Sequence, residues 1–219
     1  MCIQLQLAGE KMNSEFSSGS IHDPPLFPDD FEPFCFHVII RFEEPSESGY
    51  SNYYELYRGK LIDYELPSPD ERKIIQRIVE RLNKSPLSDE YRICSLLFHV
   101  HLFSNPDDDA EESDTVVRPD ITVFKDRKRV GCYGFMGAPD LIVEVLSEAT
   151  KYNDRYRKYS LYEEAGVSEY WIVDPVSKTV AIHLLSEGKY GSPEVIPANC
   201  PVPNGILKNI VIDFPDFTI

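Results

Sequence analysis

The feature that most constrains this chain is a glutamate in the middle of an otherwise apolar run. Apart from Glu144, residues 141–146 (LIVEVL) are apolar on both alternating faces, which is typical of a strand in a sheet that is covered on both sides. A carboxylate in such a strand costs several kcal/mol unless a partner compensates its charge. Glu144 therefore predicts either a metal ion or an interior Arg or Lys beside it.

Asp120 raises the same question at the start of a second apolar run, residues 121–124 (ITVF). If the two runs are adjacent strands, Asp120 and Glu144 could share one cation; otherwise Asp120 only caps the strand entry. Asp140 and Glu144 form a poorer pair, because four residues of one strand separate their Cα atoms by roughly 13 Å. Ligands of one Mg²⁺ ion must bring their oxygens to within about 2.1 Å of it. Asp120 is therefore the preferred partner.

The first part of the domain is predicted to be a hairpin and a helix. Two strand-like runs, 53–56 and 60–66, are separated by a turn in which Gly59 supplies the positive φ. Apolar residues then recur at helical spacing between positions 74 and 82. Ser68 offers the N-cap of this helix, and a proline and a capping-box glutamate follow it. The pattern predicts a helix over 69–84.

The rest of the pattern predicts a sheet with one further helix. Strands are expected at 92–102, 116–124 and 141–146, a helix at 150–164 that stops near Gly166, strands at 169–173 and 179–185, and a short element at 207–214. This alternation indicates an α/β class with a central mixed sheet flanked by helices. Trp171 is expected in the core.

The first part of the chain differs from the rest. Residues 1–34 mix Ser, Pro, Asp and Gly without sustained periodicity, and a strand is plausible at 34–42. The prediction is an extended or partly disordered arm over 1–48, followed by one domain over 49–219. A chain of 219 residues is long enough for one such domain with a substantial core.

The net charge of -15 speaks against a non-specific nucleic-acid binder, because such binding depends on Lys and Arg. The excess is local, however: residues 1–50 hold nine acids and two bases, and 105–114 hold six acids and no base. The second run is interpreted as a solvated loop. Basic clusters remain at 125–129 and 151–158, so the charge allows a DNA-facing surface without indicating one.

The chain is expected to be cytoplasmic. Its five cysteines are scattered without a Cys-x-x-Cys pair, which favours a reducing compartment over a disulfide framework or a structural zinc site. No apolar run approaches the roughly 18 residues of a membrane-spanning helix, and no secretory signal is visible. No membrane partner is expected.

Two groups of side chains are interpreted as ordinary structure. His99 and His101 would share one face of a strand, which could suit metal ligands, but no third ligand is evident. The tyrosines of the 150–164 helix, Tyr152, Tyr156 and Tyr159, have the spacing of a face packed onto the sheet. Core packing is therefore preferred over base stacking.

Several segments together resemble a known family. They are YYELYRGKL at 53–61, PSPDERKIIQRIVERL at 67–82, Arg118-Pro119-Asp120, and GAPDLIVEVLSEATKYNDRYRKYSLYEEAGVSEYWIVDP at 137–175. The chain from about residue 53 to 217 resembles the Uma-two-type putative restriction endonucleases, a bacterial family within the PD-(D/E)XK nuclease superfamily.

The resemblance implies a restriction-endonuclease-like fold with a site for Mg²⁺ or Mn²⁺. It implies that Glu55, Asp120 and Glu144 are the metal ligands, and that Asp120 and Glu144 are catalytic together with a lysine. The superfamily's usual lysine position, two residues after the glutamate, is Leu146 here. The resemblance points instead to Lys158 on the following helix, with Lys151 as the alternative. Asp154, Lys158 and Tyr162 would then share roughly one helix face.

Two functions follow from these expectations. The first is a divalent-metal-dependent endonuclease that hydrolyses phosphodiester bonds in DNA; whether it pairs as a homodimer to cut both strands is left open. The second is a catalytically inactive nuclease-fold module that binds nucleic acid or a protein partner, a reading that the acidic net charge favours. Retention of three acids and a candidate lysine argues for the first.

Overall fold

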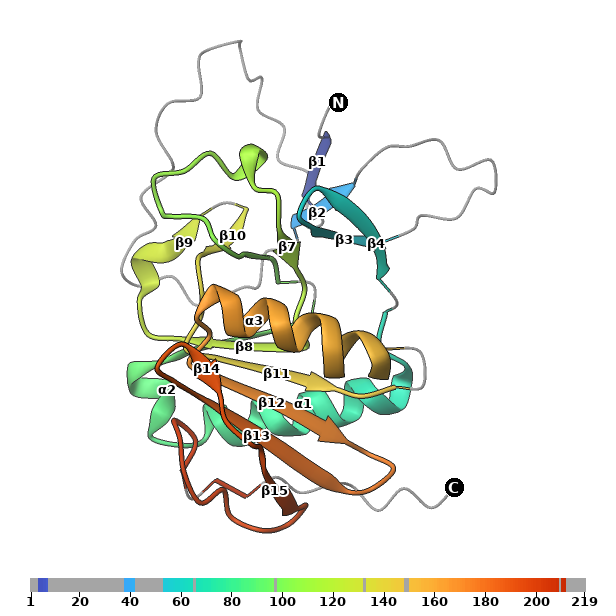
Figure 1. Cartoon of the computed structure of the whole chain (residues 1–219), viewed down its shortest axis with the longest axis vertical. Helices are drawn as coiled ribbons and strands as arrows, with labels where there is room; N and C mark the ends of the chain where they lie inside the picture. The colour runs from blue at the N-terminus through green and yellow to red at the C-terminus, as the bar shows by residue number, and fades with distance from the viewer. Residues whose placement is uncertain are drawn as a thin grey trace.

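Figure 1 shows the computed structural model of the chain, which describes residues 4–7, 38–41, 53–64, 66–96, 98–131, 133–147, 150–208 and 210–211. The helices are α1 (Pro69–Asn83), α2 (Leu87–Glu90) and α3 (Tyr159–Ala165), and a π-helical stretch, Asn153–Lys158, leads directly into α3. This stretch is called the π segment below. Short 3-10 turns lie at Ala110–Glu112 and Arg127–Arg129.

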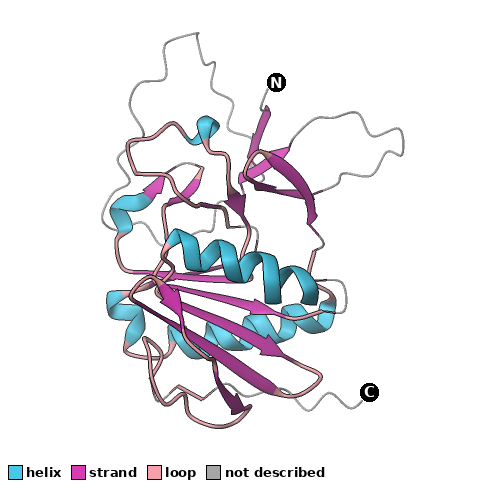
Figure 2. Ribbon diagram, viewed as in Figure 1, coloured by secondary structure: helices cyan, strands magenta, loops and turns pink. Residues whose placement is uncertain are grey.

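The strands belong to three sheets. They are β1 (Gln4–Leu7), β2 (Val38–Arg41), β3 (Tyr53–Tyr57), β4 (Lys60–Tyr64), β5 (Arg92–Ser95), β6 (Val100–His101), β7 (Val116–Val117), β8 (Ile121–Phe124), β9 (Val130–Gly131), β10 (Gly134–Met136), β11 (Leu141–Val145), β12 (Glu169–Asp174), β13 (Thr179–Ser186), β14 (Lys189–Tyr190) and β15 (Glu194–Pro197). The central sheet has the order β14-β13-β12-β11-β8-β5, with β15 beside β13. A smaller sheet has the order β4-β3-β7-β6-β10-β9, and β1 pairs with β2. Figure 2 shows the smaller sheet above the central one.

The central sheet is mixed and covered by helices on both faces, as the sequence predicts. Strand β11 runs parallel to β12 and antiparallel to β8. Leu141, Val143 and Val145 of β11 pack in one core with the apolar face of α1. Ile142 and Leu146 point the other way, into a second core with α3. Glu144 lies on this second face, because side chains alternate along a strand.

The predicted hairpin and first helix are confirmed. Strands β3 and β4 pair antiparallel around Arg58 and Gly59, whose φ angles of 48° and 74° are both positive, as a tight type I′ hairpin turn requires. At α1, the Ser68 side chain accepts from the Glu71 N–H, and the Glu71 carboxylate accepts from the Ser68 N–H. This reciprocal cap explains why the helix begins at Pro69.

Two runs predicted as single long strands are each divided between the two sheets, so both predictions are wrong in extent. The 92–102 run forms β5 in the central sheet and β6 in the smaller one, and the chain turns away at Leu96, where φ is 48°. The 116–124 run forms β7 in the smaller sheet and β8 in the central one. Pro119 separates the two, since it has no N–H to continue a ladder.

Other expectations are confirmed in outline. The 150–164 helix is present as the π segment and α3, and it ends at Gly166 with φ 89°. Residues 105–114 connect β6 to β7 as a mostly exposed loop. Of the expected element at 207–214, the described residues show only an isolated bridge between Pro201 and Val211. The arm is described only at β1 and β2, so the prediction for residues 1–48 mostly falls outside the described residues. None of the helices in the described ranges combines the length and hydrophobicity needed to cross a bilayer.

Candidate active site

Glu144 is compensated by a lysine and a tyrosine from the helix that covers it. The residue is only 3% exposed. Its Oε1 accepts from Lys158 Nζ at 2.8 Å and from the Tyr162 hydroxyl at 2.7 Å. The two donors are four residues apart, and both are buried on the side of the helix that faces β11. Lys158 thus provides the cationic partner that the sequence predicts for this carboxylate.

Asp120 lies beside Glu144, as predicted, because β8 and β11 are neighbours with Val143 opposite Ile121. The Asp120 N–H donates to Glu144 Oε2 at 3.4 Å. Its carboxylate Oδ2 accepts from the Val145 N–H at 2.7 Å, so the two residues are linked across the strands in both directions. Asp140 points elsewhere: its Oδ2 accepts from the Lys125 N–H at 2.8 Å.

The smaller sheet contributes Glu55 from β3. This side chain is buried, with Oε1 accepting from the Arg118 N–H at 2.7 Å and Oε2 accepting from the Tyr57 hydroxyl at 2.8 Å. Glu55 Oε1 also lies 3.4 Å from Lys158 Nζ. The candidate site therefore lies where the hairpin, the central sheet and the π segment meet.

Lys158 joins three carboxylates. Besides Glu144 and Glu55, its Nζ lies 3.6 Å from Asp154 Oδ1, one turn earlier in the π segment. The lysine side chain is 5% exposed. Lys151, the alternative lysine, is exposed at the start of the helix. Asp154, Lys158 and Tyr162 do share one buried helix face, and Lys158 is the lysine that reaches the carboxylates.

The electrostatics of the site are set first by the burial of its ionisable groups. Burial raises the pKa of the Glu144 carboxyl well above its usual value, although Lys158 opposes this effect. Burial likewise raises the pKa of Asp154, and it raises the pKa of Asp120 to about 7. Burial alone would lower the pKa of the Lys158 ammonium, but the charges of Glu144 and Glu55 outweigh it and raise this pKa well above its usual value.

The donor set fits a divalent cation in its chemistry. The buried carboxylates of Glu55, Glu144 and Asp154 surround the Lys158 ammonium, and Asp120 lies beside Glu144. Carboxylate oxygens are the ligands that Mg²⁺ and Mn²⁺ prefer. In the described part of the chain, no three His, Cys, Asp or Glu side chains are already arranged as a metal-ligand group. The Lys158 ammonium lies among the carboxylates instead.

Two tyrosines of the site, Tyr57 and Tyr64, were not singled out from the sequence, and Arg118 was named there only as part of the Arg118-Pro119-Asp120 segment. Tyr57 holds Glu55, and the Asn153 side-chain amide donates to the Tyr57 hydroxyl at 3.1 Å. Tyr57 stands two residues after Glu55 on one strand, so the two side chains point to the same face, and this spacing could have identified Tyr57 from the sequence. The Tyr64 hydroxyl is buried without a hydrogen-bond partner in the described structure. The Arg118 guanidinium lies 5.6 Å from the Tyr64 ring centre.

Both rings of the histidine pair have hydrogen-bond partners within the protein. Arg118 Nε donates to His99 Nε2 at 2.8 Å, so that nitrogen carries a lone pair and the ring is neutral. Burial, with the nearby Arg118 charge, lowers the pKa of His99 to about 3. His101 has hydrogen-bond partners at both ring nitrogens, Ser113 Oγ at 2.9 Å and the Tyr133 carbonyl at 3.1 Å. Both rings are structural, as preferred from the sequence.

The prediction that the helix tyrosines pack in the core is wrong for two of the three. Tyr152 and Tyr156 are 64% and 62% exposed. Tyr159 is partly buried and packs against Tyr190 and His183. The inward positions of this helix are taken by Asp154, Lys158 and Tyr162, which leaves Tyr152 and Tyr156 facing solvent. Trp171 is fully buried, as expected.

Comparisons with known proteins agree with this architecture. A solved structure, described as a putative nuclease belonging to DUF820 from Anabaena variabilis ATCC 29413, matches with a TM-score of 0.58 at 20% identity and covers 74% of this chain and 88% of that chain. At this identity the likeness shows the fold. No curated protein matches the chain. The family model described as Uma2, putative restriction endonuclease, matches residues 43–213, most of the chain, and the chain therefore belongs to the Uma2 family.

Proposed function

We propose that this chain is an endonuclease that hydrolyses phosphodiester bonds in DNA with the help of Mg²⁺ or Mn²⁺, and that it acts in the cytoplasm. The observation that carries the proposal is the buried cluster itself, in which one ammonium faces three carboxylates and the carboxylate of Asp120 lies beside them. Such a cluster is costly for a fold to keep unless a further cation binds there. The descriptions of the family, a putative restriction endonuclease, and of the structural neighbour, a putative nuclease, support the reaction class.

Asp120 and Glu144 would hold the metal, with Glu55 contributing from the hairpin. The metal supplies Lewis-acid charge, which polarises a phosphoryl oxygen and favours attack by water. Lys158 would stabilise the negative charge that grows on the phosphate, since its ammonium already lies 2.8 Å from Glu144 Oε1. Tyr162 and Tyr57 would fix the orientations of Glu144 and Glu55 through hydrogen bonds of 2.7 Å and 2.8 Å.

Calorimetric titration with Mn²⁺ tests the metal site directly. The wild-type chain should bind Mn²⁺. Asp120→Asn and Glu144→Gln should abolish or strongly weaken binding, because each replaces a charged ligand with a neutral amide of similar shape. Asp140→Asn is the matched control, since Asp140 flanks the same strand but bonds to the Lys125 N–H. Equal Mn²⁺ binding by all three variants would contradict the assignment.

Cleavage is tested on supercoiled plasmid and on labelled single strands. With Mg²⁺ or Mn²⁺ the wild-type chain should cut, and it should not cut in EDTA. Glu144→Gln and Lys158→Met should each lower the rate by at least about a hundredfold. Intact DNA after prolonged incubation with the wild-type chain and both metals would reject the nuclease proposal.

A second candidate is an inactive nuclease-fold module that binds nucleic acid or a protein partner. It is favoured by one observation: Lys158 already contacts Glu55, Glu144 and Asp154, and the described residues hold no preformed three-ligand group. In such a module the lysine would serve as the permanent counter-ion. This candidate predicts no Mn²⁺ binding that depends on Asp120, so the same titration separates the two.

A further inference from the structure

Two tyrosines form an exposed aromatic pair on the outer face of the helix that carries Lys158. Tyr152 and Tyr156 are 64% and 62% exposed, and their ring centres are 5.1 Å apart. The Arg157 guanidinium lies 6.0 Å from the centre of the Tyr152 ring. Adjacent aromatic rings held in solvent are a feature of surfaces that bind flat partners, because ring faces gain from stacking.

The charge around this pair is positive, although the chain as a whole is acidic. Residues 150–158 contain four bases and one acid, whereas the chain as a whole has 22 bases and 37 acids. Asp154 and Lys158 are both buried on the inner face, so the exposed charges of this stretch are three bases, Lys151, Arg155 and Arg157. The outer face therefore offers aromatic rings together with cationic side chains, which complements a polyanion that carries flat bases.

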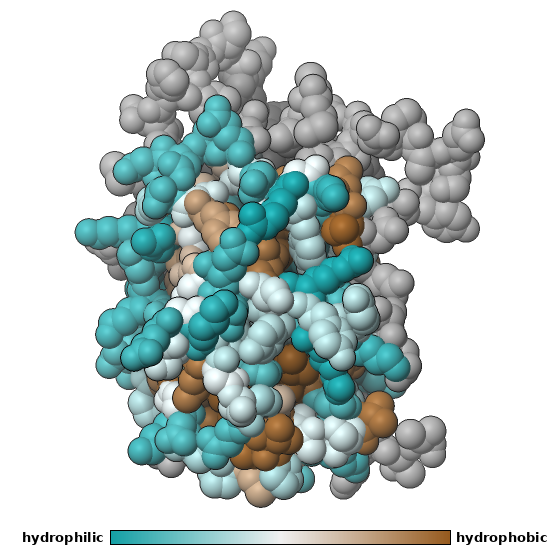
Figure 3. Space-filling view, viewed as in Figure 1, coloured by the Kyte–Doolittle hydropathy of each residue, from teal (hydrophilic) through white to brown (hydrophobic). Residues whose placement is uncertain are grey.

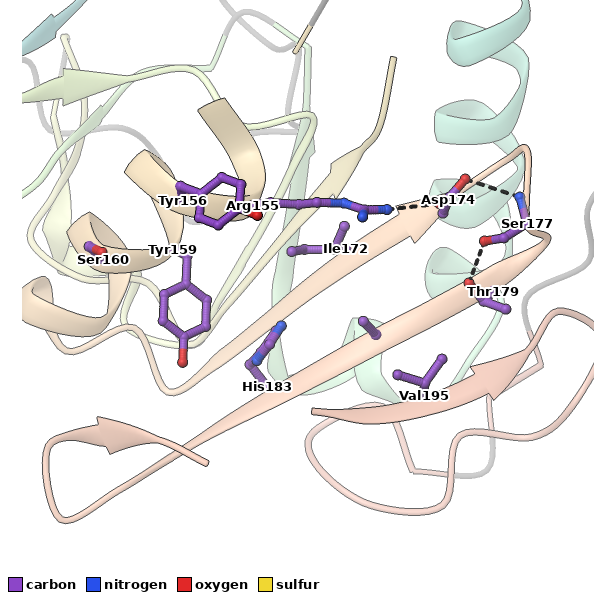
Figure 4. A pocket seen from close by; sticks show the side chains of 11 residues that line it. Arg155, Tyr156, Tyr159, Ser160, Ile172, Asp174, Ser177, Thr179, His183 and Val195 are labelled. Atoms are coloured by element: carbon purple, nitrogen blue, oxygen red, sulfur yellow. Dashed lines mark hydrogen bonds and ion pairs between the residues drawn. The ribbon is translucent and has the colours of Figure 1, made fainter. Parts of the chain in front are cut away.

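A hollow continues this surface toward the sheet. It has a volume of about 830 Å³ and is lined by Arg155, Tyr156 and Tyr159 from the helix and by His183 from β13, among others. Figure 4 shows Tyr156 and Tyr159 on the helix side of the hollow and Arg155 extending across it to Asp174, which it contacts at 2.9 Å. Ligand-binding pockets commonly have volumes of about 300–1,000 Å³, so the hollow has room for a nucleotide.

The aromatic pair and the carboxylate cluster are two faces of the same short helical stretch. Asp154 and Lys158 of the π segment point inward to Glu144 and Glu55, and Tyr152 and Tyr156 point outward. A helix with its side chains is only about 10 Å across, so a DNA strand bound on the outer face would lie within about that distance of the buried cluster. The face of the molecule on which this helix lies is otherwise largely hydrophilic (Figure 3).

We propose that Tyr152, Tyr156 and the adjoining hollow bind unpaired bases of single-stranded DNA, so that the strand is held across the helix next to the carboxylate cluster. The inference rests on the proposed nuclease function and specifies its substrate. Single-stranded segments are favoured over duplex because paired bases already stack on each other and present only their edges, whereas unpaired bases expose the faces that tyrosine rings need. Arg157, which lies beside the Tyr152 ring, would contact the strand's phosphates, and Arg155 would do so on leaving Asp174.

Fluorescence anisotropy in EDTA tests this proposal without cleavage. The probes are a labelled oligothymidylate of about 20 nucleotides and a duplex of the same length. The double variant Tyr152→Ala/Tyr156→Ala should weaken oligothymidylate binding by at least about tenfold, and Tyr152→Phe/Tyr156→Phe should stay within about twofold of wild type. Phe103→Ala is the control, because Phe103 is another exposed ring, 45% exposed, with an arginine guanidinium 5.4 Å from its centre.

Each outcome decides the proposal. A selective loss with the alanine pair, at an unchanged melting temperature, supports it. Unchanged oligothymidylate affinity in the alanine pair, an equal loss in Phe103→Ala, or no binding of single strands by the wild-type chain overturns it. If the binding test fails but metal-dependent plasmid cleavage is seen, the nuclease proposal stands. If oligothymidylate binds as expected but no metal-dependent cleavage is seen, the nuclease proposal alone is rejected.

Discussion

Replacing Lys158 with methionine should destabilise the fold strongly in the absence of divalent metal. The change keeps a long apolar stem but removes the ammonium that lies 2.8 Å from Glu144, 3.4 Å from Glu55 and 3.6 Å from Asp154. All four side chains are at most 5% exposed, so water cannot take over the lost role. Breaking a buried ion pair by removing one partner costs about 3–5 kcal/mol.

Urea unfolding followed by tryptophan fluorescence measures this loss, because Trp171 is the sole tryptophan and is fully buried. With a urea m-value of about 2 kcal/mol/M, the midpoint should fall by roughly 2 M. Lys189→Met is the matched control: its ammonium also lies 2.8 Å from a glutamate, Glu163, but its side chain is 79% exposed. The control should leave the midpoint nearly unchanged, since exposed pairs are screened by water.

Divalent metal should reverse much of the loss. A ligand that binds the folded state stabilises it by about 2.7 kcal/mol at a hundred times its Kd. Mn²⁺ should therefore raise the midpoint of Lys158→Met by more than that of the wild-type chain, because the variant's carboxylates lack their counter-ion. The reasoning is refuted if Lys158→Met and Lys189→Met unfold at the same urea concentration without metal.

Three further predictions test the surroundings of the site. Ser68→Ala should lower the free energy of unfolding by about 1 kcal/mol in urea titrations, because the α1 cap is lost. His99 has a pKa of about 3 in the fold, below its unfolded value of about 6.5. Its contribution to stability is therefore full above about pH 6.5 and is lost as the pH falls toward 3. Between pH 7 and pH 4, the free energy of unfolding should fall by about 3 kcal/mol less in His99→Gln, which keeps an acceptor, than in the wild-type chain. Gly205→Ala should lower the melting temperature markedly, since φ is 92° and the new Cβ would meet the Glu169 carboxylate, whereas Gly191→Ala, with open space, should not. Equal shifts in the two glycine variants would show that neither the positive φ of Gly205 nor its close approach to Glu169 carries a cost.

Local patterns were enough to place the elements that hold the main site residues. Helical spacing and a capping box fixed α1, and the apolar run around Glu144 identified β11 as a buried strand. Distance along a strand was enough to prefer Asp120 over Asp140 as the neighbour of Glu144, and β8 does lie beside β11. These features follow from contacts between residues close in sequence, or from the cost of burying a charge.

The division of the chain between two sheets could not be seen locally. The 92–102 and 116–124 runs have the composition of single strands, but each crosses from one sheet to the other. Which sheet a segment joins depends on hydrogen bonds to strands far away in the sequence. The exposure of Tyr152 and Tyr156 could not be predicted locally either. Helical spacing shows which residues share a face of the helix, but not which face packs against the rest of the protein.

The sequence by itself determined that Glu144 is a buried acid whose charge must be compensated. It also indicated the kinds of partner that could do so, a metal ion or an interior Arg or Lys. Only the tertiary structure decided that Glu55, from a hairpin, and Lys158, from a helix, meet at Glu144, with Lys158 Nζ 3.4 Å from Glu55 Oε1 and 2.8 Å from Glu144 Oε1. The physical reason is that the sequence around one residue already indicates that its charge is buried, and so that burial has a cost. The relief of that cost depends on distances of a few ångströms between segments that folding brings together.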